Sequence, residues 1–116
     1  MLMRKEKAIG KHLDPTGSWP KLPHPRQFDD ASAMFRALGE PSRLRLLSRL
    51  TSGEICVSEL AELEDEKLTT ISARLKTLHA AGLVKRRREA KHIYYALSDS
   101  HVLGLVQNAL EHASEK

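Results

Sequence analysis

Apolar residues recur every three or four positions over most of the chain, a spacing that is typical of amphipathic helices. The spacing predicts helices over residues 29–38, 40–52, 56–63, 67–81 and 99–114. Gly39, Gly53 and Gly82 stand where three of these helices should end, and Pro41 suits the first turn of the second. We expect the inward faces to carry Met34, Phe35, Leu38, Leu44, Leu47, Leu50, Val57, Leu60, Ala61, Leu68, Ile71, Leu75 and Leu78.

Two short β-type segments, 84–88 and 93–97, follow the fourth helix and are joined by residues 89–92. They predict a hairpin. The order is two helices, a short helix, the acidic turn 64–66, a helix, the hairpin and a last helix. This order predicts a mainly α fold with a small β-hairpin, the winged helix-turn-helix. The alternative is a generic helical domain that carries a hairpin.

Composition divides the chain unevenly. Residues 1–26 hold four of the five prolines and a net positive charge, which predicts a flexible basic arm. Residues 27–116 would then form a single winged helix-turn-helix domain. The single cysteine excludes an intramolecular disulfide and a multi-cysteine zinc site within one chain. Because the chain also lacks a long apolar run and a signal-peptide core, we expect a cytoplasmic protein with no membrane partner.

The net charge of +4 conceals a basic block over residues 67–92, which hold eight Lys or Arg against one Glu. A localised basic stripe is typical of nucleic-acid binding, although a solvated surface face is the alternative. We predict that the 67–81 helix reads DNA and that the hairpin holds phosphates. Tyr94 and Tyr95 are expected to pack into the domain. The candidate DNA contacts are Lys67, Thr69, Thr70, Ser72, Ala73, Arg74, Lys76, Arg86, Arg87, Arg88, Lys91 and His92.

The last predicted helix carries candidate metal ligands at both ends. Asp99 and His101 precede His112 and Glu115 in the pattern D-x-H-x10-H-x-x-E. These donors suit tetrahedral zinc and are poor for soft ions. On one helix the two histidines would lie about 16 Å apart, so one chain cannot close both ends on one ion. The alternative is that Asp99 only caps the helix and the histidines are ordinary surface residues.

A two-fold dimer of antiparallel last helices would solve this problem. Asp99 and His101 of one chain would then meet His112 and Glu115 of the partner subunit, giving two equivalent sites per dimer. We expect the apolar contacts of this seam from Val102, Leu103, Val106 and Leu110, near an axis at Val106 and Gln107.

Several segments together resemble the ArsR/SmtB family of metal-sensing winged-helix repressors, over about residues 30–116. The resemblance is carried by ALGEPSRLRLL at 37–47, EICVSEL at 54–60, ISARLKTL at 71–78 and HIYYAL at 92–97. It implies a homodimer, formed through the N- and C-terminal helices, that binds an imperfect inverted repeat of operator DNA. The ligand pattern is similar to the C-terminal-helix zinc site of the SmtB-like branch. The resemblance then implies that metal releases the DNA and derepresses genes of metal efflux or sequestration.

Two features depart from the family pattern. Other branches bind soft metals through Cys-x-Cys with cysteines of the arm, whereas Val57 and Ser58 follow Cys56 here and the arm has no cysteine. Cys56 is therefore expected to be a buried structural residue; the alternative is a minor metal site with Glu59 and His12 or His24. Ala90 stands at the wing tip where many members carry glycine, which puts the turn geometry in question.

Three functions compete at this stage. The main prediction is a zinc-responsive repressor, with Co²⁺ or Ni²⁺ able to use the same donors. The second is a repressor of the same family that answers a redox, sulfur or protein signal. The third is a small zinc hydrolase, but the chain has no HExxH, no Gly-rich phosphate loop and no nucleophile constellation. We therefore predict no enzyme and no small organic substrate.

Overall fold

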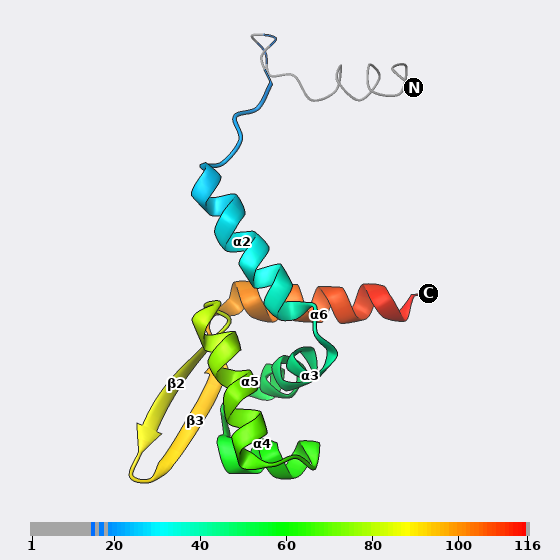
Figure 1. Cartoon of the computed structure of the whole chain (residues 1–116). Helices are drawn as coiled ribbons and strands as arrows, with labels where there is room; N and C mark the ends of the chain where they lie inside the picture. The colour runs from blue at the N-terminus through cyan, green and yellow to red at the C-terminus, as the bar shows by residue number, and fades with distance from the viewer. Residues whose placement is uncertain (1–14, 16, 18, 116) are drawn as a thin grey trace.

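A helical body carries a projecting β-hairpin (Figure 1). The computed structural model describes residues 15, 17 and 19–115, so most of the predicted arm lies outside the described residues. The mainly α fold with a hairpin is confirmed. Its elements are α2 (Pro25–Leu38), α3 (Pro41–Arg49), the 3-10 turn η1 (Leu50–Ser52), β1 (Ile55–Cys56), α4 (Val57–Glu64), α5 (Leu68–Ala80), β2 (Val84–Glu89), β3 (His92–Leu97) and α6 (Ser100–Ser114).

Helix α2 begins four residues earlier than the sequence pattern predicts. Pro25 occupies its first turn, where the missing N–H costs nothing. His24 caps it: its Nδ1 accepts from the Arg26 backbone N–H at 3.0 Å, and the Gln27 side chain accepts from the His24 N–H at 3.0 Å. The prediction is wrong because a proline, which favours loops elsewhere, is well accepted in the first turn of a helix. The predicted boundary between arm and domain at residues 26 and 27 thus falls within the first turn of α2.

The sheet has a third strand that the sequence did not predict. Its order is β1-β3-β2, all antiparallel, with Ile55 opposite Tyr95 and Cys56 opposite Tyr94. Cys56, predicted to start a helix, instead lies in β1 and is the N-cap of α4. A strand of two residues is too short to display a period, so no pattern could indicate it.

The hairpin turn is tighter than predicted. Glu89 pairs with His92, so only Ala90 and Lys91 connect the strands. Ala90 has a φ of 56°, in the left-handed region where a Cβ is unfavourable. The chain therefore makes the tight turn at the wing tip even though alanine replaces the glycine of many family members, and the alanine is strained.

A single core joins the helices and the base of the sheet. Ile71, Leu75 and Leu78 of α5 are completely buried in it. Leu68 was predicted to share this face, but it is 52% exposed because it lies in the first turn of α5, beyond the core. Phe35 of α2, also predicted inward, is 61% exposed.

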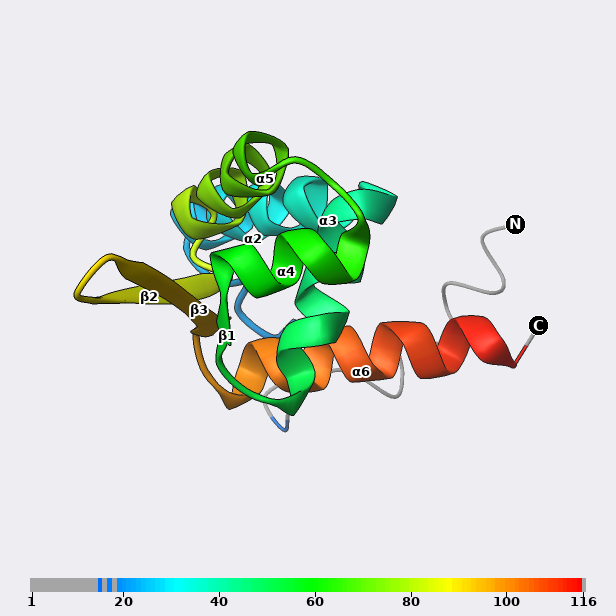
Figure 2. The ribbon, with the colours of Figure 1, turned by 90° about the horizontal axis from the view of Figure 1, so that it is seen from below.

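Helix α6 uses part of its predicted seam for its own core. Val102 and Val106 are buried within the chain and pack with the other core residues. They are therefore not available to a partner, which corrects the predicted contact set. Leu103 is half-buried and Leu110 is 39% exposed, so these two remain accessible. Seen from below, α6 runs along one edge of the body while the hairpin projects from its side (Figure 2).

Helix α5 ends at Ala80, one residue before the predicted end, and Gly82 closes it as predicted. The Leu83 N–H donates to the Leu78 carbonyl at 3.0 Å, and the Gly82 N–H donates to the His79 carbonyl at 3.0 Å. This is the Schellman arrangement, which needs a left-handed residue after the helix. Gly82, with a φ of 77°, provides it. The turn directs the chain from α5 into β2.

Candidate DNA-binding surface and metal-ligand pairs

Helix α5 presents a polar face opposite its buried one. The side chains of Lys67, Thr69, Ala73 and Lys76 are exposed, while Thr70 and Ser72 are half-buried. Lys67 is the N-cap residue rather than the first helical residue that the sequence predicted. The face therefore begins with the helix N-terminus, whose free N–H groups favour phosphate. Such a face can contact base edges through its hydroxyls and cations.

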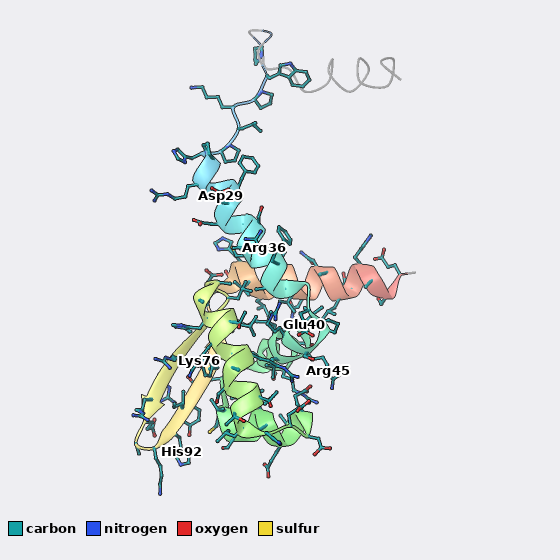
Figure 3. All side chains as sticks on the ribbon, viewed as in Figure 1. Asp29, Arg36, Glu40, Arg45, Lys76 and His92 are labelled. Carbon is teal, nitrogen blue, oxygen red and sulfur yellow. The ribbon has the colours of Figure 1, made fainter. Side chains whose placement is uncertain are left out.

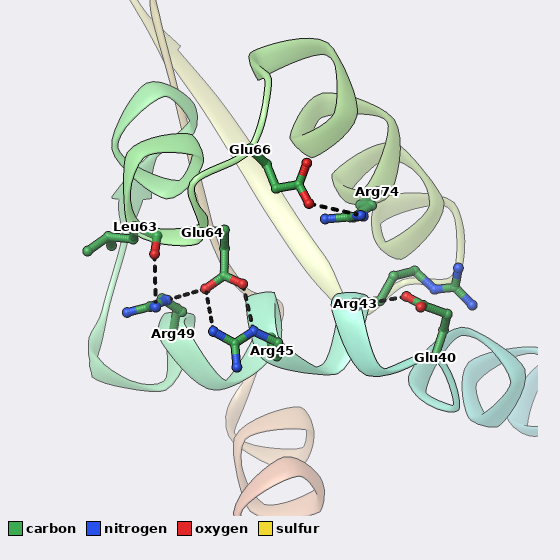
Figure 4. Close-up of polar contacts among 8 residues, drawn as sticks. All are labelled: Glu40, Arg43, Arg45, Arg49, Leu63, Glu64, Glu66 and Arg74. Carbon is green, nitrogen blue, oxygen red and sulfur yellow. Dashed lines mark hydrogen bonds and ion pairs between the residues drawn. The ribbon is translucent and has the colours of Figure 1, made fainter.

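Arg74 is less available than this face suggests. Its guanidinium lies 3.7 Å from the Glu66 carboxylate, and its side chain is only 25% exposed (Figure 4). Glu66 belongs to the turn that leads into α5. Arg74 thus helps to hold that turn against the helix, so a DNA contact by Arg74 would have to replace this ion pair.

The wing has two chemically different faces, because successive side chains of a strand point to opposite sides. Arg87 lies opposite Tyr94, and its guanidinium carbon is 4.6 Å from the centre of the Tyr94 ring. The same guanidinium donates to Glu54 at 2.9 Å and to Glu89 at 2.6 Å. These two carboxylates raise the pKa of Arg87 above its ordinary value. Arg87 is therefore already neutralised within the chain, unlike the free phosphate clamp that the sequence predicted.

The other face of the wing meets α5. Arg86 lies opposite Tyr95 and Arg88 opposite Ile93 in the hairpin register. A groove of about 470 Å³ runs between this face, α5 and the start of α4. Its basic lining comes from Lys76 on one side and from Arg86 and Lys91 on the other, and His92 also lines it. Figure 3 shows Lys76 on α5 and His92 towards the wing tip. The structure thus brings the two predicted DNA-binding elements onto one concave basic surface.

Cys56 lies in this groove and is not the buried structural residue that we expected. It is half-buried, with its Sγ 3.3 Å from Ser58 Oγ and 4.0 Å from His92 Nδ1. The Ser58 hydroxyl, together with the N–H groups of Ser58 and Glu59 at the start of α4, lowers the pKa of the Cys56 thiol. The sequence predicts His92 only as a DNA contact, because nothing in it relates residues 36 positions apart.

Within the described residues, the structure does not bring His24 to the predicted minor metal site at Cys56 and Glu59. His24 caps α2 through Nδ1, which leaves that nitrogen committed to a backbone N–H. His12 lies outside the described residues. Cys56 and Glu59 remain together at the start of α4.

Glu64 joins helix α4 to helix α3, a role that the sequence did not indicate. It was predicted in an acidic turn, but it is the last residue of α4 and its side chain is only 6% exposed. Arg45 Nε lies 2.7 Å from one carboxylate oxygen and Arg49 Nε lies 2.6 Å from the other. Figure 4 shows both arginines on α3 converging on this carboxylate. The bonds to Arg45 and then Arg49 lower the pKa of Glu64 and join α4 to α3.

The four predicted metal ligands form two pairs at opposite ends of α6. His101 Nδ1 lies 3.7 Å from Asp99 Oδ1, and His112 Nδ1 lies 3.8 Å from Glu115 Oε1. Both histidines are well exposed, at 96% and 79% of their side-chain surface. As predicted, Asp99 is the N-cap of α6 and accepts from the Val102 N–H at 3.0 Å. In the described part of the chain, no three candidate ligands come together.

The donor pairs can be tested against zinc geometry. Two ligands held about 2.0–2.1 Å from a tetrahedral ion lie roughly 3.3 Å apart. The observed 3.7 and 3.8 Å need only a small side-chain adjustment to reach this separation. Each pair supplies one nitrogen and one oxygen, so two pairs from two chains complete an N₂O₂ set. The residues therefore fit zinc, provided that a second chain contributes.

Taken together, the fold and the basic groove define a winged-helix DNA-binding protein. A family model described as a helix-turn-helix domain matches residues 38–87. The transcriptional repressor SmtB homolog of Synechocystis sp. is 38% identical over 80% of this chain and 73% of that protein. The cadmium resistance transcriptional regulatory protein CadC homolog of Staphylococcus aureus is 36% identical over 74% of this chain and 72% of that protein.

Among solved structures, similarity extends to the homodimeric winged helix-turn-helix DNA-binding domain of Mb0332 from Mycobacterium bovis. Its TM-score is 0.74 at 31% identity, covering 83% of this chain and 92% of that one. The chain belongs to the ArsR/SmtB family of winged-helix transcriptional regulators. None of the helices among the described residues has the length and apolar character needed to span a bilayer.

Proposed function

We propose that this chain is a metal-responsive transcriptional repressor whose metal-free dimer binds operator DNA and whose metal-bound dimer releases it. The observation that carries the proposal is the position of the two ligand pairs. Asp99 with His101 and His112 with Glu115 are exposed at opposite ends of α6, where a single chain cannot join them. A metal held by these pairs would link two chains and would thereby alter their relative geometry.

The DNA contacts of the proposal come from α5 and the groove-facing side of the wing. Two copies related by a two-fold axis would place two α5 helices in successive major grooves of an imperfect inverted repeat. Arg86, Arg88 and Lys91 would hold the flanking phosphates. The protein would act in the cytoplasm, where its DNA lies.

Exposed apolar side chains support a dimer formed through α2 and α6. Phe28 and Phe35 of α2 are 49% and 61% exposed, and Leu110 of α6 is 39% exposed. A small apolar groove of about 180 Å³ lies between α2, α3 and α6, lined by Leu105 and Ala109 among others. Exposed apolar surface of this kind is typical of an interaction site. It adjoins the helix that carries the ligand pairs.

Zinc is the metal that we propose, with two sites in each dimer. Asp99 and His101 of one chain, with His112 and Glu115 of the partner subunit, would hold it. The N₂O₂ donor set favours zinc over soft ions, while Co²⁺ and Ni²⁺ accept the same donors. The name of the cadmium resistance regulator among the relatives supports a metal signal. Genes of metal efflux or sequestration are the targets that we expect.

The test is fluorescence anisotropy of a labelled fragment of the protein's own promoter. Metal-free protein should bind tightly, and one zinc per chain should weaken binding by about 5- to 150-fold, the usual range of allosteric coupling. His112→Ala should keep DNA binding and lose the zinc response. Glu111→Ala, which changes the neighbouring exposed residue outside the pattern, is the matched control and should respond normally. Tight binding that ignores zinc, cobalt and nickel contradicts the proposal.

The surroundings of Cys56 support a second candidate, a repressor that answers a thiol-reactive signal. The Cys56 pKa is lowered and its sulfur lies in the groove between α5 and the wing. Peroxide treatment followed by mass spectrometry and the same anisotropy assay tests this function. Only a modified Cys56 that accompanies DNA release, and that Cys56→Ser prevents, supports it.

A further inference from the structure

Ser98 connects the proposed metal site to the end of helix α5. It lies between β3 and α6, directly before the metal-ligand candidate Asp99. The Ser98 N–H donates to the Leu83 carbonyl at 3.1 Å, and the Ser98 hydroxyl donates to the Gly82 carbonyl at 2.8 Å. One residue is thereby bonded to two of the three residues that link α5 to β2.

The first of these bonds continues the hairpin ladder, but the second does not. Val84 and Leu97 are the first paired residues of β2 and β3, so the bond from Ser98 N–H to Leu83 extends the pairing by one step. The hydroxyl bond to Gly82 reaches past the strand into the Schellman turn that ends α5. It is therefore a side-chain contact that the sheet itself does not require.

Gly82 is well suited to respond to such a contact. It has a φ of 77°, and apart from Gly82 and its two chain neighbours nothing in the described structure lies within 4 Å of the position that a Cβ would occupy. A glycine with free space can change its backbone angles at little cost. A displacement of Ser98 can therefore turn the end of α5 and the start of β2, the two elements that line the DNA groove.

Asp99 supplies the other half of the connection. Its Oδ1 caps α6 by accepting from the Val102 N–H and also lies 3.7 Å from His101 Nδ1. A metal held by this carboxylate would compete with the cap and shift residue 99, which is covalently joined to Ser98. Resting on the proposed function, we propose that the Ser98 hydroxyl bond to Gly82 transmits the state of the metal site to α5 and the wing.

The test compares Ser98→Ala with Ser114→Ala. Ser114 is a close control because its hydroxyl donates to the Glu111 carbonyl at 2.7 Å and it stands beside Glu115, as Ser98 stands beside Asp99. DNA affinity is measured with and without zinc, and zinc affinity is measured on the free protein. Ser98→Ala should retain zinc affinity and metal-free DNA affinity. The ratio of the DNA affinity without zinc to the DNA affinity with zinc should fall by about tenfold. Ser114→Ala and Ser98→Thr, which keeps the hydroxyl, should retain the wild-type ratio.

Three results overturn the proposal. An unchanged ratio in Ser98→Ala removes Ser98 from the coupling. A loss of metal-free DNA binding or of zinc affinity in Ser98→Ala makes the residue structural rather than a transmitter. An equal fall of the affinity ratio in Ser114→Ala means that the loss of a serine hydroxyl at either end of α6 has the same effect, so the bond to Gly82 is not specific.

A measurement without metal separates this proposal from the proposed function. Asp99→Ala, which removes the cap of α6, should speed hydrogen exchange at the Gly82 and Leu83 amides in otherwise wild-type protein. The same change should have no further effect in a Ser98→Ala background, where the connection is already cut. If wild-type DNA binding ignores zinc but this pattern of exchange holds, the metal function fails and the connection stands. Unaltered exchange at both amides overturns the connection.

Discussion

Glu54 and Arg87 form a two-point ion pair between the residue before β1 and the wing, with Arg87 Nη2 2.9 Å from Glu54 Oε1 and Nε 2.9 Å from Oε2. Arg87 also meets Glu89 and lies over the Tyr94 ring. One arginine in the middle of a basic run thus serves the fold of the wing. Its neighbours Arg86 and Arg88 point to the opposite face of the hairpin, where the proposed function assigns them to phosphate contacts.

This division predicts different salt dependences for neighbouring arginines. Arg86→Ala and Arg88→Ala should each lower the slope of log affinity against log salt by about 0.9, the value of one lost phosphate contact. Arg87→Ala should leave the slope unchanged. Anisotropy titrations between low and moderate salt measure the slopes. If Arg87→Ala lowers the slope as much as Arg86→Ala does, Arg87 exchanges its carboxylates for phosphate on binding.

Glu64 predicts a link between pH and stability. Its pKa is lowered by Arg45 and Arg49, so its stabilising effect is present above the unfolded pKa of about 4.3 and is lost as pH falls through the folded pKa. Glu64→Gln should lower the free energy of unfolding at neutral pH by about 1 kcal/mol, since Arg45 is exposed and screened. The difference from wild type should shrink below about pH 4. Urea unfolding over a pH series measures it.

Glu62→Gln is the matched control, because Glu62 lies in the same helix and is exposed. Its stability should follow that of wild type at every pH. A constant difference between Glu64→Gln and wild type down to pH 3 would mean that the carboxylate charge is not what stabilises the α3–α4 contact.

The helices could be predicted from the sequence because each has a repeated apolar face and a clear stop. Ile71, Leu75 and Leu78 are spaced so that only a helix places all three in one core, and Gly82 ends that helix as expected. That Asp99 lies near His101 and His112 near Glu115 could also be expected, since the members of each pair are two or three residues apart. Contacts between residues that are close in the chain can be predicted because their spacing is visible in the sequence.

Contacts between distant residues could not be predicted in the same way. Glu54 lies 33 residues from Arg87, and Cys56 lies 36 residues from His92. Only the pairing of β1 with β3 brings these positions together, and β1 is too short to leave a pattern. The prediction that Val102 and Val106 contact a partner subunit was wrong for a related reason. An apolar residue on α6 does not indicate whether the core of its own chain or a partner will cover it.

The wing turn predicts a stabilising substitution. Ala90 has a φ of 56°, where an L-residue with a Cβ costs about 1–2 kcal/mol relative to its preferred conformation. Ala90→Gly should raise the free energy of unfolding by up to about 1 kcal/mol, the gain being reduced by the greater freedom of glycine in the unfolded chain. Ala96→Gly, within β3, is the control and should lower it by about 0.5–1 kcal/mol. Thermal or urea unfolding tests both, and a destabilised Ala90→Gly contradicts the strained turn.

Cys56 offers a direct probe of the proposed DNA-binding groove, because the chain has no other cysteine to compete for a thiol reagent. Ser58 and the start of α4 lower the pKa of the thiol, so iodoacetamide should alkylate Cys56 at a lower pH than an unstructured cysteine peptide. Ser58→Ala removes the hydroxyl bond and should move this pH profile upward. Since Cys56 lines the groove with Lys76 and Arg86, promoter DNA should slow alkylation in proportion to the fraction of protein bound. Alkylation that proceeds at the same rate on fully bound protein would place the DNA elsewhere than between α5 and the wing.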